Sequence, residues 1–156
     1  MTGTTIRVKS LDNVVVEEIK RFRIKIGLFT GPEYEEISDI TLVDQKVVYR
    51  AKTKDGKYVV NFDGDEGPKY REVWGLTNIG DKYAYAAENE DREWFVVVND
   101  QEGPKYLWVT KPISIGNKPA YAAQNEDGKY LVNFDGKEIF DKSLLELKGE
   151  FEGKWN

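Results

Sequence analysis

Gly67-Pro68-Lys69-Tyr70 returns as Gly103-Pro104-Lys105-Tyr106, and Gly31-Pro32-Glu33-Tyr34 precedes both, so the motif recurs every 36 residues. When the units that begin at the last two copies, 67–102 and 103–138, are laid over each other, close to half of the positions are identical. Self-similarity at a fixed period of this length is typical of repeat architectures. The sequence therefore predicts a tandem array of 36-residue units.

Each unit predicts short antiparallel strands joined by tight turns. Asp-Gly pairs between apolar segments favour type I′ hairpin turns, because both central residues of such a turn need a positive φ. These pairs are Asp55-Gly56, Asp63-Gly64, Asp127-Gly128 and Asp135-Gly136. The third strand of each unit alternates with a period of two, and 31–138 shows no helical spacing. We therefore expect an all-β chain.

A second set of tyrosines predicts the core. Tyr49, Tyr85 and Tyr121 stand 36 residues apart, and the latter two are flanked by alanines. Large residues that face small ones let neighbouring sheets interlock. Trp94 is expected in the core as well, because it replaces the tyrosine that the other units carry at this position.

The ends of the chain read as degenerate copies of the repeat. We predict a single repeat domain over 1–156, with an irregular first blade at 1–36, three regular blades at 37–146 and a closing strand at 147–156. Terminal units are expected to be atypical because they cap or close an array.

The strand and turn pattern resembles a known repeat family. Gly80-Asp81-Lys82-Tyr83-Ala84-Tyr85-Ala86 and Gly116-Asn117-Lys118-Pro119-Ala120-Tyr121-Ala122 resemble the WD40-like repeat of TolB-type β-propellers. The signature proline of that family's turn is missing here. WG-type repeats are a second possibility, although no Gly-Trp pair stands in the expected place.

The resemblance implies a small β-propeller. Its blades have four antiparallel strands each, and four blades of 36 residues nearly account for the 156 residues. In this interpretation Gly-Pro-x-Tyr-x-x-Val opens the outermost strand of a blade. Two alternatives stay open, namely an eight-bladed ring shared by two chains and a fifth blade formed with the C-terminal segment.

The composition excludes several kinds of chemistry. The chain has no histidine and no cysteine, which removes the common nucleophile–base pairs and the soft-metal sites. Asp63-Gly64-Asp65-Glu66 lacks the ligand spacing of an EF-hand loop, and we interpret it as a hairpin turn. We therefore expect no enzyme activity, no cofactor and no metal.

Charge and hydropathy bear on partners and location. The net charge of −5 offers no excess of Lys and Arg for phosphates, so no nucleic acid is expected. No run approaches the roughly 20 apolar residues of a membrane helix, and the first residues lack a signal-like apolar stretch. A cytoplasmic location is the default expectation, and a removed leader stays open.

A candidate ligand site follows from the propeller interpretation. Trp74 and Trp108 depart from the repeat. The counterparts of Trp74 are Ser38 and Thr110, and those of Trp108 are Glu36 and Glu72. The predicted loop face carries six residues: Trp74, Trp108, Asn89, Asp91, Asn125 and Asp127. The structural alternative is that each tryptophan packs over its neighbouring blade while Asn and Asp serve the turns.

The predicted function is a non-catalytic binding or scaffold module. Exposed aromatics beside amides and carboxylates suit a sugar ring or a peptide that carries basic or apolar side chains, and a protein or peptide ligand is the first expectation. Two alternatives are a lectin-like carbohydrate binder and a structural homo-oligomer whose ring edges mediate assembly.

Overall fold

The computed structural model describes residues 5–6, 18–20, 24–26, 29–30 and 33–140, with side chains from residue 33 onward. These residues form seventeen strands and no helix, and all strand pairs are antiparallel. The all-β prediction is therefore confirmed. The chain divides into two compact units, 1–69 and 70–156, which are described separately.

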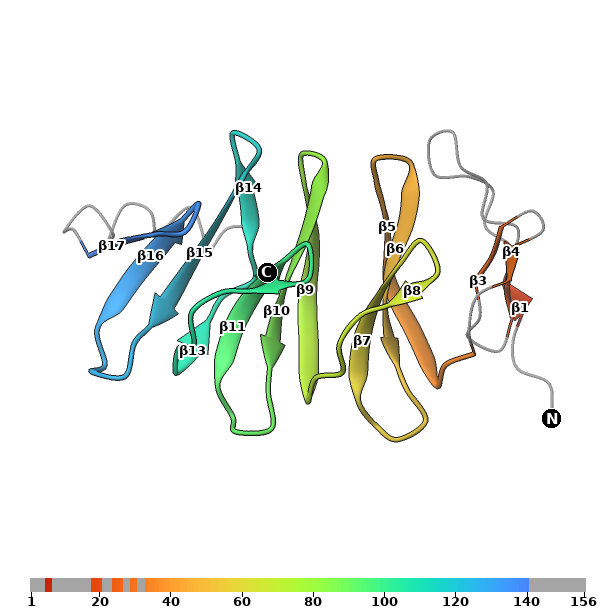
Figure 1. Ribbon diagram of the computed structural model, residues 1–156, viewed down its shortest axis with the longest axis horizontal. Coiled ribbons are helices and arrows are strands. Elements are labelled where there is room, and N and C mark those ends of the chain that lie inside the picture. The colour runs from red at the N-terminus through yellow and green to blue at the C-terminus, as the bar shows by residue number, and fades with distance from the viewer. Residues whose placement is uncertain (1–4, 7–17, 21–23, 27–28, 31–32, 141–156) are drawn as a thin grey trace. The chain divides into compact units, whose positions relative to one another are not determined.

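The first unit contains two four-stranded sheets in which every strand pairs with its neighbours in the chain. The first sheet consists of β1 (Thr5–Ile6), β2 (Glu18–Lys20), β3 (Ile24–Ile26) and β4 (Phe29–Thr30). The second consists of β5 (Glu36–Val43), β6 (Lys46–Lys52), β7 (Tyr58–Phe62) and β8 (Asp65–Glu66) (Figure 1).

The second unit repeats this meander twice. Its first sheet consists of β9 (Glu72–Ile79), β10 (Lys82–Glu88), β11 (Trp94–Val98) and β12 (Gln101–Glu102). Its last sheet consists of β13 (Trp108–Val109), β14 (Ile113–Ile115), β15 (Lys118–Gln124), β16 (Tyr130–Phe134) and β17 (Lys137–Ile139). β13 and β14 both pair with β15 and together take the place of β9, because Pro112 has no N–H for a continuous ladder.

The Asp-Gly turns are of two kinds. At 63–64 and at 135–136 both residues have positive φ, which confirms the predicted type I′ turns. At 55–56 and 127–128 only the glycine has positive φ, so the type I′ prediction is wrong there. These two loops are wider than a two-residue turn. In the first, the Thr53 N–H donates to the Lys57 carbonyl at 2.8 Å, and in the second, the Asn125 N–H donates to the Lys129 carbonyl at 2.9 Å.

The core of the second unit lies between its two sheets, which stand side by side in Figure 1. Ala84, Ala86 and Val96 of the first sheet pack with Tyr121 and Leu131 of the last. The predicted core tyrosines Tyr49, Tyr85 and Tyr121 are all buried, as expected for rings that face small residues. Trp94 is partly buried and packs against the inter-sheet core.

The first unit has its own core. Tyr34, Val47, Tyr49, Ala51 and Val59 form a buried cluster there. Removing this apolar surface from water is the main force that holds each unit together.

The tyrosine of each Gly-Pro-x-Tyr motif makes the same contacts every 36 residues. Its buried hydroxyl donates to a glutamate 32 residues later, and its ring packs edge-on against the tyrosine 15 residues later. The hydrogen bonds are Tyr34 to Glu66, Tyr70 to Glu102 and Tyr106 to Glu138, at 3.0, 2.8 and 2.7 Å. The ring pairs are Tyr34–Tyr49, Tyr70–Tyr85 and Tyr106–Tyr121, at 6.1, 6.2 and 6.3 Å.

The last of these motif copies is divided between two sheets. Tyr106 exchanges two backbone hydrogen bonds with Trp94, of 2.7 and 3.0 Å, and so belongs to the edge of the preceding sheet. Trp108 and Val109 pair with β15 in the following sheet. The expectation that Gly-Pro-x-Tyr-x-x-Val opens the outermost strand of a blade is therefore wrong for this copy. The buried Tyr106 ring anchors the point where the chain crosses from one sheet to the next.

Each of the four sheets is open within the described strands, which form no closed barrel. Ring closure therefore stays a prediction. The closing strand expected at 147–156 lies outside the described residues.

Candidate functional site

The two tryptophans of the predicted loop face lie on different sheets. Trp74 on β9 stands directly opposite Ala86 of β10, and cross-strand partners share a face. Because Ala86 belongs to the inter-sheet core, Trp74 lies on the face that looks toward the last sheet. Trp108 on β13 stands opposite Gln124, on the outer face of the last sheet. The structure therefore does not bring the six residues into one cluster.

Trp74 borders a close junction between strands. Gly75 has a φ of +72°, and a Cβ placed on it would lie 2.7 Å from the Cβ of Lys111. The Thr77 hydroxyl, on the same strand, lies 3.1 Å from the carbonyl oxygen of Pro112. Trp74 itself is 37% exposed, although its face of β9 looks toward the last sheet.

Trp108 belongs to a separate aromatic group. It meets Tyr130 of β16 edge to face, with ring centroids 6.4 Å apart and an interplanar angle of 83°. Tyr130 is 65% exposed, Trp108 41%, and Phe140, which follows β17, 51%. We name Trp108, Tyr130 and Phe140 the terminal aromatic patch. Monomeric proteins seldom leave such large apolar side chains grouped in water without a partner.

A hollow of about 560 Å³ adjoins the terminal aromatic patch. Its lining combines the two rings of Tyr130 and Phe140 with the polar loop between β15 and β16. The lining residues are Asn125, Asp127, Gly128, Lys129, Tyr130 and Phe140. A concave surface that is partly aromatic, with a few charged groups at its rim, is a typical form of binding site.

The predicted asparagines serve the turns. Asn125 Oδ1 accepts the backbone N–H groups of Asp127 and Lys129, at 3.1 and 2.9 Å. Asn89 Oδ1 does the same for Asp91 and Glu93, at 3.0 Å each. The structural alternative, in which the asparagines serve the turns, is therefore correct for both amide oxygens, because each accepts backbone N–H groups of its own loop.

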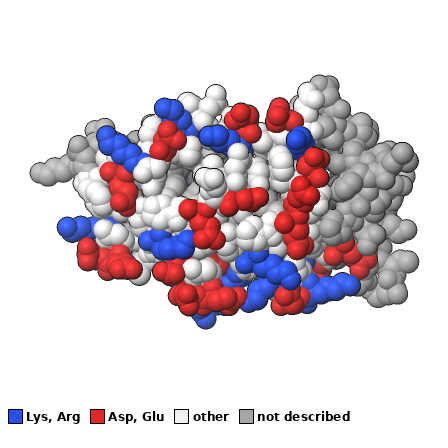
Figure 2. Space-filling model, in the orientation of Figure 1, with Lys and Arg blue, Asp and Glu red and all other residues white. Residues whose placement is uncertain are grey.

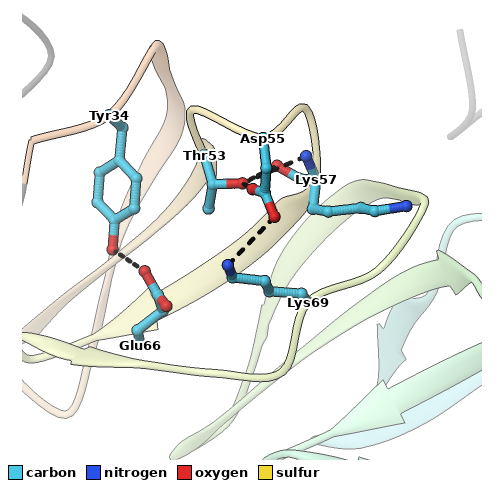
Figure 3. A network of polar contacts seen from close by, with 6 residues as sticks. All are labelled: Tyr34, Thr53, Asp55, Lys57, Glu66 and Lys69. Carbon is cyan, nitrogen blue, oxygen red and sulfur yellow. Dashed lines mark hydrogen bonds and ion pairs between the residues drawn. The ribbon is translucent and has the colours of Figure 1, made fainter.

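The first unit builds the same loop with a hydroxyl. Thr53 Oγ1 accepts the N–H of Lys57 at 3.2 Å and also bonds Asp55, as Figure 3 shows. Lys69 Nζ lies 3.3 Å from Asp55 Oδ2. The Thr53 hydroxyl first, and then Lys69, hold the pKa of the Asp55 carboxyl below its usual value. The loop geometry is therefore a property of the fold and not of a ligand site.

Three of the six predicted residues border the hollow or the patch: Trp108, Asn125 and Asp127. The other three, Trp74, Asn89 and Asp91, belong to the preceding sheet and its loop. The sequence missed Lys129, Tyr130 and Phe140. Tyr130 carried no distinguishing signal, because its alternation with Val132 and Phe134 reads as an ordinary core strand.

The exposed large apolar side chains of the described residues all lie in the second unit: Trp74, Leu107, Trp108, Tyr130 and Phe140. In the described part of the face shown in Figure 2, Lys and Arg side chains are interspersed with Asp and Glu. The same residues contain no group of three or more acidic side chains placed to hold a metal ion. Nor do they contain a helix with the length and apolar character to cross a membrane.

In comparisons with protein-family models, curated proteins and solved structures, none matches this chain.

Proposed function

We propose that this chain is a non-catalytic binding and scaffold module that presents the terminal aromatic patch to a protein or peptide ligand. The observation that carries the proposal is the 560 Å³ hollow beside the exposed rings of Tyr130 and Phe140. Large aromatic side chains supply most of the binding free energy at protein interfaces when a partner removes them from water. A patch of this kind gains most from a ligand with apolar side chains.

A peptide fits the geometry better than a sugar does. The rings of Trp108 and Tyr130 are nearly perpendicular, so one flat sugar ring cannot stack on both. The Asn125 Oδ1 atom, which would suit a sugar hydroxyl, already accepts two backbone N–H groups. Carbohydrate binding is therefore the second candidate, and a glycan array with reproducible hits would favour it.

We propose further that the sheets are WD40-like blades of one repeat array. The hydrogen bonds and ring pairs that recur every 36 residues support this proposal. Native mass spectrometry tests closure: a monomer of 17.9 kDa favours a ring within one chain, and a dimer favours a ring shared by two. A stable dimer that binds no peptide would favour the structural homo-oligomer.

The binding proposal is tested by selection from a random peptide library displayed on phage. Enriched peptides should bind the wild-type chain and lose affinity for Trp108→Ala and Tyr130→Ala. Trp74→Ala is the matched control, because it removes an indole of similar exposure outside the patch. Equal losses in all three variants, or no enriched peptide, would refute the site.

A further inference from the structure

We propose that the ligand is an extended peptide that adds a strand segment to the edge of β16 at Tyr130, which no strand among the described residues covers, with an aromatic side chain as its anchor. This inference rests on the proposed function and specifies its ligand. Strand addition takes its affinity from main-chain hydrogen bonds and its specificity from pockets for the side chains.

The preceding sheet contains the template for this mode of binding. There the segment after β12 continues along β11: the Gly103 N–H donates to the Val96 carbonyl at 2.9 Å, and Tyr106 exchanges two hydrogen bonds with Trp94. The Tyr106 ring is buried against Ala86 and its neighbours. A short extended segment with one tyrosine therefore fits the end of a sheet of this type.

The last sheet has the same edge up to the point where Tyr106 would lie. β17 pairs with β16 at three positions and ends at the pair Val132–Ile139, 36 residues after Val96 and Gly103. Tyr130 stands 36 residues after Trp94, and the pairs Gln124–Tyr130 and Glu88–Trp94 correspond. Because backbone groups of a strand point alternately to its two sides, the Tyr130 N–H and C=O face outward, as those of Trp94 do.

Within the described residues, nothing takes the place of Tyr106 at this edge, and three observations agree. Tyr130 is 65% exposed, whereas Trp94 is packed against the core. Ala122 is partly exposed, whereas its counterpart Ala86 is fully buried. The hollow lies between Tyr130 and Phe140, and Phe140 corresponds to Pro104, which leads into Tyr106.

The chemistry of the edge defines the ligand. Two main-chain hydrogen bonds to Tyr130 require an extended backbone. The partly exposed Ala122 leaves room for a flat ring, since Ala86 accommodates Tyr106 in the preceding sheet. Lys129 and Asp127 at the rim can pair with charges of either sign beside that ring.

The probe is a labelled peptide with the chain's own sequence from Gln101 to Val109, titrated into the full-length protein. We expect saturable binding by fluorescence anisotropy. The same peptide with alanine in place of its tyrosine should bind at least about tenfold more weakly, because the anchor ring is lost. No saturable binding, or equal binding of the two peptides, would overturn the proposal.

The decisive measurement is hydrogen exchange at the Tyr130 amide. Strand addition should slow this exchange in the presence of the peptide, while binding through side chains alone should leave it unchanged. Tyr130→Pro removes this N–H at the first residue of a strand, a position where proline is tolerated, and should weaken binding at least about tenfold. Tyr130→Ala lowers the affinity but keeps the N–H, so at a saturating concentration of the peptide it should retain protection at residue 130.

The outcomes separate this inference from the proposed function. If library peptides bind and depend on Trp108 while the Tyr130 amide stays unprotected, strand addition is refuted and the binding module stands. If neither these peptides nor the probe bind, both proposals fail. Since the exchange measurement uses the wild-type chain, the result does not depend on whether Tyr130→Pro folds.

Discussion

Trp94 and Tyr130 occupy the same position in two successive sheets, yet their surroundings differ. Each is the first residue of its strand, and each stands opposite the last residue of the preceding strand. Trp94 is bonded to Tyr106 and packs against the core, whereas Tyr130 is 65% exposed. The burial of a strand residue therefore depends on whether a later segment of the chain covers it, as well as on the alternation of apolar and polar residues in its strand.

The sequence explains the difference. After 102 the chain continues with Gly-Pro-Lys-Tyr, whose tyrosine covers the strand edge and enters the next core. After 138 the corresponding residues are Ile139, Phe140, Asp141 and Lys142. Lysine is almost never fully buried unless it is paired, so it is no substitute for the tyrosine ring. In its last copy, the motif that defines the repeat thus also covers the edge of the preceding sheet.

The largest expected effect is the loss of the folded state at high pH, because it acts on every covered tyrosine at once. Burial first, and then the Glu138 carboxylate, raise the pKa of Tyr106 to about 12. Burial also raises the pKa of Tyr34 to about 12, although Asn61 opposes it. A folded pKa above the unfolded value means stability that is complete below about pH 10 and lost as the pH rises toward about 12.

Phenolate absorbance and circular dichroism, followed together against pH, check this prediction. The buried tyrosines should ionise only as the sheets unfold, so the late part of the absorbance change should coincide with the loss of the circular dichroism signal. Complete ionisation of all tyrosines with an unchanged spectrum would contradict the role of the buried hydroxyls.

Next in size is the difference between Tyr106→Ala and Tyr130→Ala. Tyr106 is buried between the sheets, so its truncation should lower the free energy of unfolding by about 3–5 kcal/mol. Tyr130 is largely exposed, and its truncation should change the free energy of unfolding by about 0.5 kcal/mol or less. Guanidinium denaturation of both variants measures the two values, and similar losses would erase the contrast between the sheets.

A smaller effect distinguishes two copies of the covering tyrosine. Tyr106→Phe removes the hydroxyl that accepts a hydrogen bond from the buried Nδ2 of Asn133 at 3.3 Å, and should lower the free energy of unfolding by about 1–3 kcal/mol. The position that corresponds to Asn133 is Val97 beside Tyr70, and Glu102 keeps its ion pair with Lys105 at 2.9 Å. Tyr70→Phe should therefore cost about 1 kcal/mol or less. A larger loss for Tyr70→Phe would show that Asn133 contributes little.

The sequence predicted the parts of the structure that depend on local chemistry. The period of the repeat, the all-β class and the buried tyrosines follow from alternation and turn residues, which act over a few positions. It did not predict that the last motif copy crosses between sheets, because the crossing depends on the packing of the Tyr106 ring against residues that are distant in the sequence.

The candidate site was predicted less well, for a physical reason. Trp108, Asn125 and Asp127 were found because they break the repeat or belong to loops. Tyr130 could not be found from the sequence around β16, because its alternation with Val132 and Phe134 is that of a core strand, whereas its side chain is 65% exposed. Trp74 was wrongly grouped with Trp108. Trp74 lies on the face of its sheet that looks toward the last sheet, whereas Trp108 lies on the outer face of the last sheet.

The smallest expected effect concerns the loop that lines the hollow. Asn125→Ala removes the acceptor of two backbone N–H groups and should lower the free energy of unfolding by about 1 kcal/mol. Asn125→Thr should recover most of this, because Thr53 holds the corresponding loop of the first unit through its hydroxyl. Thermal denaturation measures both. Because the amide oxygen is turned to the backbone, peptide binding at saturating concentration should survive in either variant. A loss of binding in Asn125→Thr at unchanged stability would assign this amide to the ligand and make the loop, rather than the strand edge, the centre of the site.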